Sequence, residues 1–213
     1  MIYQMLTIKH DVRVCLDENL TTTALQGIAD QETLSLDDLI VSKVLEAVKQ
    51  AHNDAPYYML EGKDFSSESV TWNTNDTSGV ISLPVDFMRL VMFEMSDWER
   101  PVYAAISTQS PEYAKQRSRH KGIRGNAERP VVAIGLQPAG RTLEFYASKT
   151  NQATISRALY MPIPVIDIND GVDISEQCYQ AVLYMTAGLV KASMGETEAA
   201  KLFFELYKNN IEK

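Results

Sequence analysis

The side chains best suited to bind a partner are the basic residues between positions 115 and 129. This segment carries six lysines and arginines and only one carboxylate, that of Glu128. Guanidinium and ammonium groups bind phosphates and carboxylates, so the segment could contact DNA phosphates or an acidic partner, or could be an ordinary solvated loop. The six candidate contact residues are Lys115, Arg117, Arg119, Lys121, Arg124 and Arg129.

Patterns for catalysis or metal binding are missing from the sequence. The histidines, His10, His52 and His120, stand apart, and there is no His-Glu-x-x-His, Asp-x-Asp, Gly-x-Ser-x-Gly or phosphate-loop pattern. Cys15 and Cys178 lie in apolar helical patterns without a Cys or His at ligand spacing, so we predict buried thiols. We therefore expect no enzyme activity, no metal and no cofactor.

The chain as a whole is acidic, with a formal net charge of −8 at pH 7. An acidic protein repels nucleic acid at long range, which favours contact of the basic segment with a partner over contact with DNA. The sequence has no apolar run of about 18 residues and no basic-then-apolar leader. We therefore expect a protein that is made in and stays in a cytoplasm and does not span a membrane.

Helical patterns occupy the N-terminal quarter of the chain. A short amphipathic helix is predicted from Thr7 to about Glu18. A second helix is predicted to begin at Ser35, because Asp38 follows three residues later as in a loose capping box, and to end near Asn53–Asp54.

Two more helices are predicted at the other end. One opens at Asp173 or Ser175 and ends at Gly195, and the last runs from Glu196 to Ile211 after a very short link. Residues 1–55 and 172–213 are therefore predicted to form one discontinuous bundle of about four helices. The predicted inward residues of the last helix are Ala199, Leu202, Phe203, Leu206 and Tyr207.

Residues 56–171 are predicted to be an inserted β-rich section with a short helix near 111–118, capped by Ser110. Its centre is a strand over Met88–Met95, followed by a tight turn and predicted to be covered on both faces. The loop from Arg119 to Glu128 is predicted to be exposed and mobile. The predicted strands are 57–60, 69–72, 80–83, 88–95, 131–136, 142–147 and 155–161.

The patterns together predict an α+β protein. We expect a helical bundle with an antiparallel β-meander or sandwich inserted between the second and third helices. The 213 residues, 45% of them hydrophobic, suffice for one sizeable core or for one core and a smaller lobe.

Four short motifs resemble the head-to-tail adaptor (connector, or neck ring) proteins of tailed bacteriophages, especially those of podoviruses and of crAss-like phages of Bacteroides. The resemblance in motifs covers about Leu83 to Val131, and that in architecture covers nearly the whole chain. The motifs are Leu83-Pro84-Val85-Asp86-Phe87-Met88-Arg89-Leu90, Trp98-Glu99-Arg100-Pro101-Val102, Ser110-Pro111-Glu112-Tyr113 and Arg129-Pro130-Val131.

This resemblance implies a structural virion protein without an active site. Such a protein forms a homo-oligomeric ring, usually dodecameric, at the head-tail junction (the virion neck). The ring joins the portal protein to the tail or to a second ring protein, and double-stranded DNA passes through its channel without specific recognition. The resemblance also implies docking on the portal through a C-terminal segment, for which only Asn209 to Lys213, at and beyond the end of the predicted last helix, are available here.

Four residues near the central strand are candidate contacts between subunits: Asp86, Arg89, Trp98 and Arg100. Asp86 and Arg89 could instead cap and pair locally. Trp98 could be an exposed interface anchor or an aromatic residue that covers the edge of the sheet. The alternative to the adaptor is a cytoplasmic module that binds nucleic acid or an acidic partner through residues 115–129.

Overall fold

The computed structural model confirms a mixed α+β fold, which divides into two compact units. The helical unit comprises residues 1–61 and 163–213, and the β unit comprises residues 62–162. The sequence analysis placed these boundaries at 55/56 and 171/172. The residues described by the structure are 1–17, 35–74, 76–118, 120, 122–138, 140–167 and 171–212.

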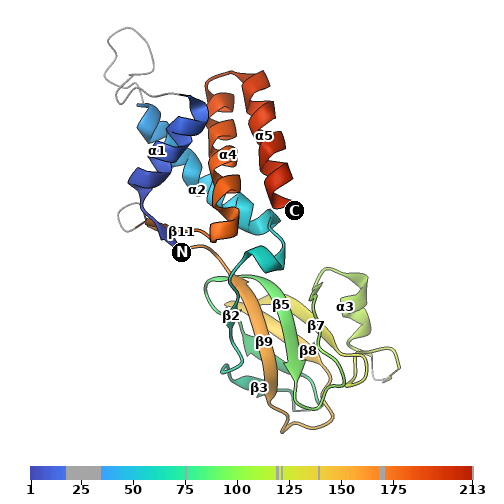
Figure 1. Ribbon diagram of the computed structural model, residues 1–213. Coiled ribbons are helices and arrows are strands. Elements are labelled where there is room, and N and C mark those ends of the chain that lie inside the picture. The colour runs from blue at the N-terminus through green and yellow to red at the C-terminus, as the bar shows by residue number, and fades with distance from the viewer. Residues whose placement is uncertain are drawn as a thin grey trace. The chain divides into compact units, whose positions relative to one another are not determined.

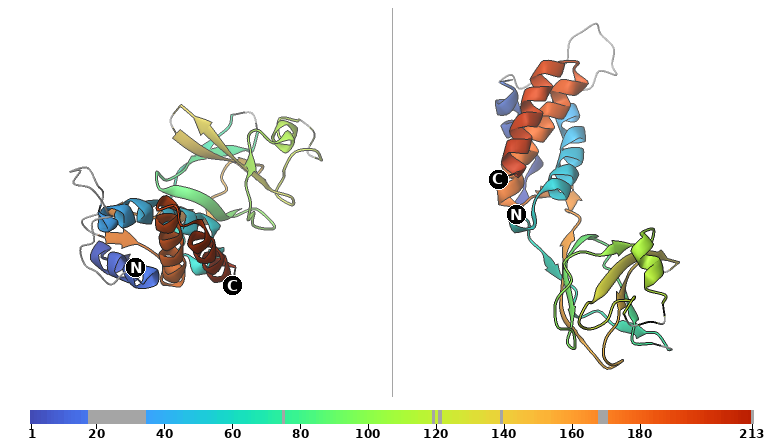
Figure 2. Two further views of the ribbon diagram at one scale, coloured as in Figure 1. Left: turned by 90° about the horizontal axis from the view of Figure 1, so that it is seen from above. Right: turned by 90° about the vertical axis from the view of Figure 1, so that its right-hand side faces the viewer.

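Among its described residues, the helical unit contains four α-helices and a small three-stranded sheet. Helix α4 contacts each of the other three helices and lies between α5 and the pair formed by α1 and α2 (Figures 1 and 2). Strand β11 pairs with both β1 and β10. The elements are β1 (Ile2–Tyr3), α1 (Met5–Leu16), α2 (Leu36–Asp54), the 3₁₀ turn η1 (Tyr57–Met59), β10 (Ile166–Asp167), β11 (Gly171–Asp173), α4 (Glu176–Ser193) and α5 (Thr197–Ile211).

The predicted N-terminal signals of α2 are confirmed. The Ser35 side chain accepts a hydrogen bond from the Asp38 backbone N–H at 3.2 Å, and the Asp38 carboxylate accepts one from the Ser35 N–H at 3.3 Å. This reciprocal box satisfies two helix-end donors that otherwise lack partners. Helix α1 is also present, but the predicted end at Glu18 lies outside the described residues.

The C-terminal helix pair matches the predicted spacing, except at Leu202 and at Ala192, which the spacing assigns to the inward face of the first helix but which is exposed. Gly195 follows α4 in a left-handed conformation at φ +82°, as expected for a glycine that ends a helix. Leu202 was predicted to point inward, but 57% of it is exposed. Because α5 packs mainly on α4, it buries only a narrow face, which includes Ala200, Tyr207 and Ile211.

The β unit contains two sheets and a short helix. One sheet has the strand order β2-β9-β5, and the other has the order β3-β4-β8-β7-β6. The elements are β2 (Lys63–Asp64), β3 (Val70–Trp72), β4 (Gly79–Ser82), β5 (Phe87–Met95), β6 (Ile106–Ser107), α3 (Pro111–Lys115), β7 (Val131–Gln137), β8 (Gly140–Tyr146) and β9 (Ile155–Pro162).

Two details of the predicted β section are wrong. The strands do not form one continuous meander: β3–β4 and β7–β8 are consecutive antiparallel pairs, but the chain changes sheets after β2, β4, β5 and β8, and β6 runs parallel to β7. Tyr57–Met59 forms the 3₁₀ turn η1 rather than a strand. Local alternation of apolar residues indicates strands but carries no information about which distant strand each one joins.

Strand β5 contributes half-buried or buried side chains at all nine positions. The fully buried ones recur about every third residue instead of every second. The pairing of β5 with β9 shifts register between Phe87 and Arg89, between Leu90 and Met92, and between Glu94 and Met95. Each shift skips one residue in the pairing, which keeps the buried Phe87, Leu90, Phe93 and Met95 on one face of the strand, while the residues paired between them are half-buried on the other face.

Candidate functional site

The basic segment begins on helix α3, where its cations contact neighbouring side chains. The Lys115 Nζ lies 3.9 Å from a carboxylate oxygen of Glu112, and the Arg117 guanidinium stands over the Tyr113 ring at 5.8 Å from its centroid. Both cations are exposed, so these contacts are weak and leave the charges accessible to a partner.

Arg124 is held more firmly than Lys115, Arg117 and Arg129, the other cations of the segment that the structure describes. Its Nη1 lies 3.2 Å from Asp76 Oδ2, and only 15% of its side chain is exposed. Burial alone would raise the pKa of Asp76, but hydrogen bonds from Ser78 and the Arg124 guanidinium outweigh burial and lower it. Arg129 is exposed, and Arg119 and Lys121 lie outside the described residues.

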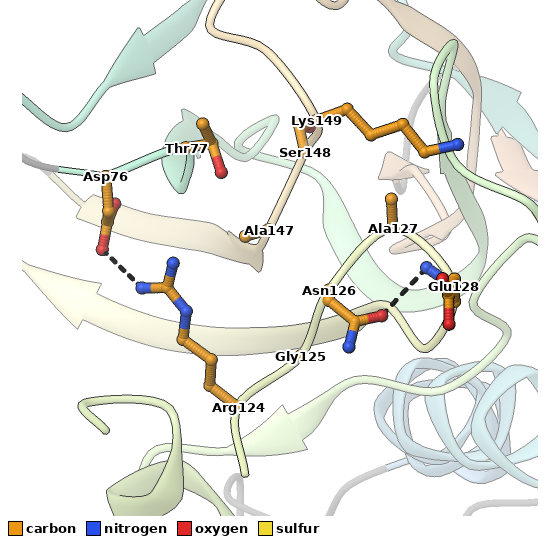
Figure 3. A pocket seen from close by; sticks show the side chains of 10 residues that line it. All are labelled: Asp76, Thr77, Arg124, Gly125, Asn126, Ala127, Glu128, Ala147, Ser148 and Lys149. Carbon is orange, nitrogen blue, oxygen red and sulfur yellow. Dashed lines mark hydrogen bonds and ion pairs between the residues drawn. The ribbon is translucent and has the colours of Figure 1, made fainter. Parts of the chain in front are cut away.

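Arg124 borders a recess of about 490 Å³ in the β unit (Figure 3). Two cations, Arg124 and Lys149, and two carboxylates, Asp76 and Glu128, line it, so its formal charges cancel. Such a recess offers both donors and acceptors but no net attraction for a DNA phosphate. The lining residues are Asp76, Thr77, Arg124, Gly125, Asn126, Ala127, Glu128, Ala147, Ser148 and Lys149.

The loop that contributes half of this recess was predicted to be exposed and mobile, but its second half packs on the sheet. Gly125 and Ala127 are buried. The Gly125 N–H donates to the buried Gln116 Oε1 at 2.7 Å, and the Gln116 Nε2 donates to the Glu112 carbonyl at 3.0 Å. These bonds tie the loop to helix α3, so Arg124 projects from a fixed backbone.

We expect Gly125→Ala to lower the free energy of unfolding by about 1–3 kcal/mol, because it forces atoms into a filled space. A Cβ at position 125 would lie 2.5 Å from the Tyr146 carbonyl oxygen, and the backbone there cannot yield as a side-chain tip can. Thermal melts monitored by circular dichroism measure the effect. The control is Gly122→Ala, where no atom lies within 4 Å; equal melting temperatures for the two variants would contradict the packed loop.

The corner before β5 holds a second cluster of polar side chains. Asp86 forms an ion pair with Lys63 at 2.7 Å and accepts a hydrogen bond from the Tyr160 hydroxyl, also at 2.7 Å. Burial and the neighbouring carboxylate raise the pKa of Tyr160 to about 12. Burial would raise the pKa of Asp86, but the hydrogen bonds from Lys63 and Tyr160 lower it overall. Asp86 therefore ties β2, β5 and β9 together.

This cluster should make the β unit sensitive to acid. The pKa of Asp86 is lower in the folded chain than in the unfolded chain. The ionised carboxylate therefore stabilises the fold at pH values above its pKa in the unfolded chain, and this stability is lost as the pH falls through its pKa in the folded chain. Asp86→Asn should therefore lower the free energy of unfolding at neutral pH and make it fall less steeply on acidification. Urea denaturation at a series of pH values from neutral to acidic measures both effects. Glu198→Gln, at an exposed ion pair, is the control; unchanged acid sensitivity in Asp86→Asn would contradict this role.

Trp98 is buried rather than exposed, so it cannot serve as an exposed interface anchor. Only 7% of the residue is accessible, and its ring meets those of Phe93 and Phe145 edge-on, with centroids 5.5 and 6.1 Å away. In the turn after β5, the backbone N–H of Trp98 donates to the Met95 carbonyl at 3.1 Å. This turn folds the indole ring back over the core. Of the other candidates, Arg89 is half-buried and Arg100 is exposed.

One polar cluster was missed by the sequence analysis. The hydroxyls of Tyr113 and Tyr146 both donate to Glu144 Oε2, at 2.8 and 2.7 Å, and so join helix α3 to strand β8. Burial and then the Glu144 carboxylate raise the pKa of both tyrosines. Tyr113 and Glu144 are 31 residues apart, so no local pattern indicates their contact.

The structure shows no group of three or more His, Cys, Asp or Glu arranged to hold a metal ion within the residues that it describes. No helix in these residues has the length and apolar character needed to cross a bilayer. Cys178 is buried as predicted, whereas Cys15 is only half-buried.

The comparisons with known proteins leave the chain without a family assignment. No family model and no curated protein sequence matches this chain.

Proposed function

We propose that this chain is a structural subunit of a tailed-phage head-to-tail adaptor, which forms a ring that joins the portal protein to the tail and continues the DNA channel. The observation that carries the proposal is the order of the units along the chain. Both ends build one helical unit, and the β unit is inserted between α2 and α4. The Leu83–Leu90 motif lies at the corner that opens strand β5.

The charge distribution supports a channel rather than a nucleic-acid reader. Each copy carries a formal net charge of −8, and a ring of about twelve copies would multiply this charge around the channel. DNA would then pass along an acidic wall without adhering to it. In the β unit, Arg124 is already paired with Asp76, so one of the six candidate cations of residues 115–129 is less available to bind a DNA phosphate.

The partners follow from this role: other copies of the chain in a ring, the portal protein, and a tail or second ring protein. The protein would be made in the bacterial cytoplasm and would function in the virion neck. Light scattering of the purified chain, alone and mixed with the portal protein of the same genome, tests the proposal. We expect a monomer or weak oligomer alone and a complex with about one adaptor per portal subunit; a chain that stays monomeric and never binds the portal would contradict it.

A second candidate function, a module that binds nucleic acid or an acidic partner, rests on the exposed side chains of Arg117 and Arg129. It predicts retention on DNA at low salt, with loss of binding as salt rises. Replacing Arg117, Arg119, Lys121 and Arg124 together by alanine would abolish that retention. The adaptor predicts little retention by the unaltered chain.

A further inference from the structure

Four connections of the β unit are joined to one another by hydrogen bonds: the β3–β4 turn, the turn after β5, the loop before β7 and the β8–β9 connection. The Ser148 N–H donates to the Thr77 carbonyl at 2.9 Å, and the Glu99 N–H donates to the Ala127 carbonyl at 3.0 Å. The Asp97 carboxylate accepts from the two backbone N–H groups that follow Ser148, at 2.5 and 3.1 Å. Loops fixed in this way keep a binding site in shape, which lowers the cost of ordering it around a ligand.

The recess that Arg124 borders lies between three of these connections (Figure 3). Each of its cations is already paired, Arg124 with Asp76 at 3.2 Å and Lys149 with Glu99 at 3.5 Å. An anionic ligand would have to compete with a carboxylate of the protein at both cations. The charged side chains are therefore better suited to form hydrogen bonds with an uncharged ligand than to bind an anion.

Two polar atoms buried in the wall of this recess, Ser148 Oγ and Arg124 Nε, have no hydrogen-bond partner among the described residues. Ser148 is only 6% exposed. Buried polar atoms nearly always have a partner, so these two mark hydrogen bonds that the described part of the chain does not supply. A hydroxyl group can accept from the Arg124 N–H and can donate to or accept from the Ser148 hydroxyl.

The lining of the recess favours a ligand rich in hydroxyl groups over a peptide. Among the described residues, its only apolar side chains are those of Ala127 and Ala147, so it lacks the pocket that a large apolar side chain of a peptide would fill. A hydroxyl both donates and accepts, which matches a wall that carries ammonium, guanidinium, hydroxyl and carboxylate groups together. The volume of about 490 Å³ falls within the usual range of small-molecule sites, about 300–1,000 Å³.

We propose that this recess binds a neutral saccharide. Hydroxyl groups of one sugar unit would donate to the Glu128 carboxylate and accept from the Lys149 ammonium group, both of which are exposed at the recess. The inference goes beyond the adaptor role and does not depend on it, because every residue involved lies in the β unit.

A second recess uses the same β8–β9 connection. It has a volume of about 420 Å³ and is lined by residues 151–155 together with part of strand β3. Its lining combines the half-buried indole of Trp72 with the exposed side chains of Glu68, Asn151 and Gln152. An indole offers an apolar face to the C–H groups of a sugar ring, and amides and carboxylates bind its hydroxyls. A saccharide of several units would extend into this second recess.

Two measurements on the full chain test the proposal: saturation-transfer difference NMR with free neutral monosaccharides, and binding to an array of neutral oligosaccharides. We expect at least one of these sugars to bind, with an affinity that stays constant between about 50 and 500 mM NaCl, because salt screens only charges. Binding of monosaccharides would assign the site to one sugar unit, and binding of oligosaccharides alone would include the second recess. No binding by any neutral sugar, or binding only of sulfated or phosphorylated glycans that salt abolishes, would overturn the proposal.

Variants of the lining locate the site. Glu128→Ala and Lys149→Ala change exposed side chains, so both should retain the melting temperature of the unaltered chain. Each should lower the affinity for the sugar about tenfold, because each removes a hydrogen bond to a charged group. The matched control is Glu205→Ala, which removes an exposed carboxylate from helix α5 and should leave the affinity unchanged. If both lining variants bind the sugar as the unaltered chain does, the recess is not the site.

Discussion

Replacing Phe145 by alanine should lower the free energy of unfolding of the β unit by about 3–5 kcal/mol, because it leaves a cavity at the centre of an aromatic cluster. Phe145 is fully buried. Its ring centroid lies 5.3 Å from that of Trp72, 6.0 Å from Phe93 and 6.1 Å from Trp98. Neighbours on several sides limit how far the site can collapse into the space, which places the loss toward the upper end of the range.

Tryptophan fluorescence during urea denaturation measures this loss directly. Trp72 and Trp98 are the two tryptophans of the chain, and both contact Phe145. The emission of the folded Phe145→Ala variant should already differ before unfolding begins. Leu136→Ala on strand β7 is the control, because Leu136 is largely exposed and its loss should change stability by less than about 0.5 kcal/mol. A loss below about 1 kcal/mol in Phe145→Ala would contradict this packing.

Gly188→Val should destabilise the helical unit by about 1–3 kcal/mol, because it overpacks the contact between α4 and α5. A Cβ at position 188 would lie 2.7 Å from the Phe204 ring and 3.3 Å from the Phe203 Cβ. Phe204 could rotate to admit one methyl group, but the two extra methyl groups of valine would have to displace helix α5.

The effect of packing must be separated from the low helix propensity of valine. Ala192→Val places the same side chain on an exposed position of the same helix, where it should cost less than about 1 kcal/mol. Far-ultraviolet circular dichroism reports the melting of the helices in both variants. If the melting temperature of Gly188→Val equals or exceeds that of the unaltered protein, α4 and α5 are less closely packed than the structure describes.

Helix ends were predictable because their signals are local. The capping box of Ser35 and Asp38, the Ser110-Pro111 start of α3 and the glycine after α4 each depend on residues within four positions of one another. The positions of β3, β4, β5, β7, β8 and β9 followed in the same way from short apolar or alternating runs, whereas the two- and three-residue strands β1, β2, β6, β10 and β11 were not predicted and the strand predicted at 57–60 was wrong. The strand order did not follow from such runs, because β4 pairs with β8 more than 55 residues later and no local pattern encodes that choice.

The candidate site was less predictable than the fold for a related reason. A cluster of basic residues is visible in the sequence, but its ion pairs are not, since Arg124 meets a carboxylate 48 residues away. Trp98 was ambiguous because a turn can direct its aromatic ring outward or back over the core. Leu202 was assigned inward because helical spacing indicates an apolar face without indicating how much of that face a neighbour covers.

The proposed adaptor role requires that copies of this chain form a ring with the portal protein. Electron microscopy of the complex purified after co-expression with the portal tests it most directly. We expect end-on images with rotational symmetry and a central channel, in which an added ring abuts the portal. Images of the portal alone, with the chain remaining separate as single copies, would contradict it.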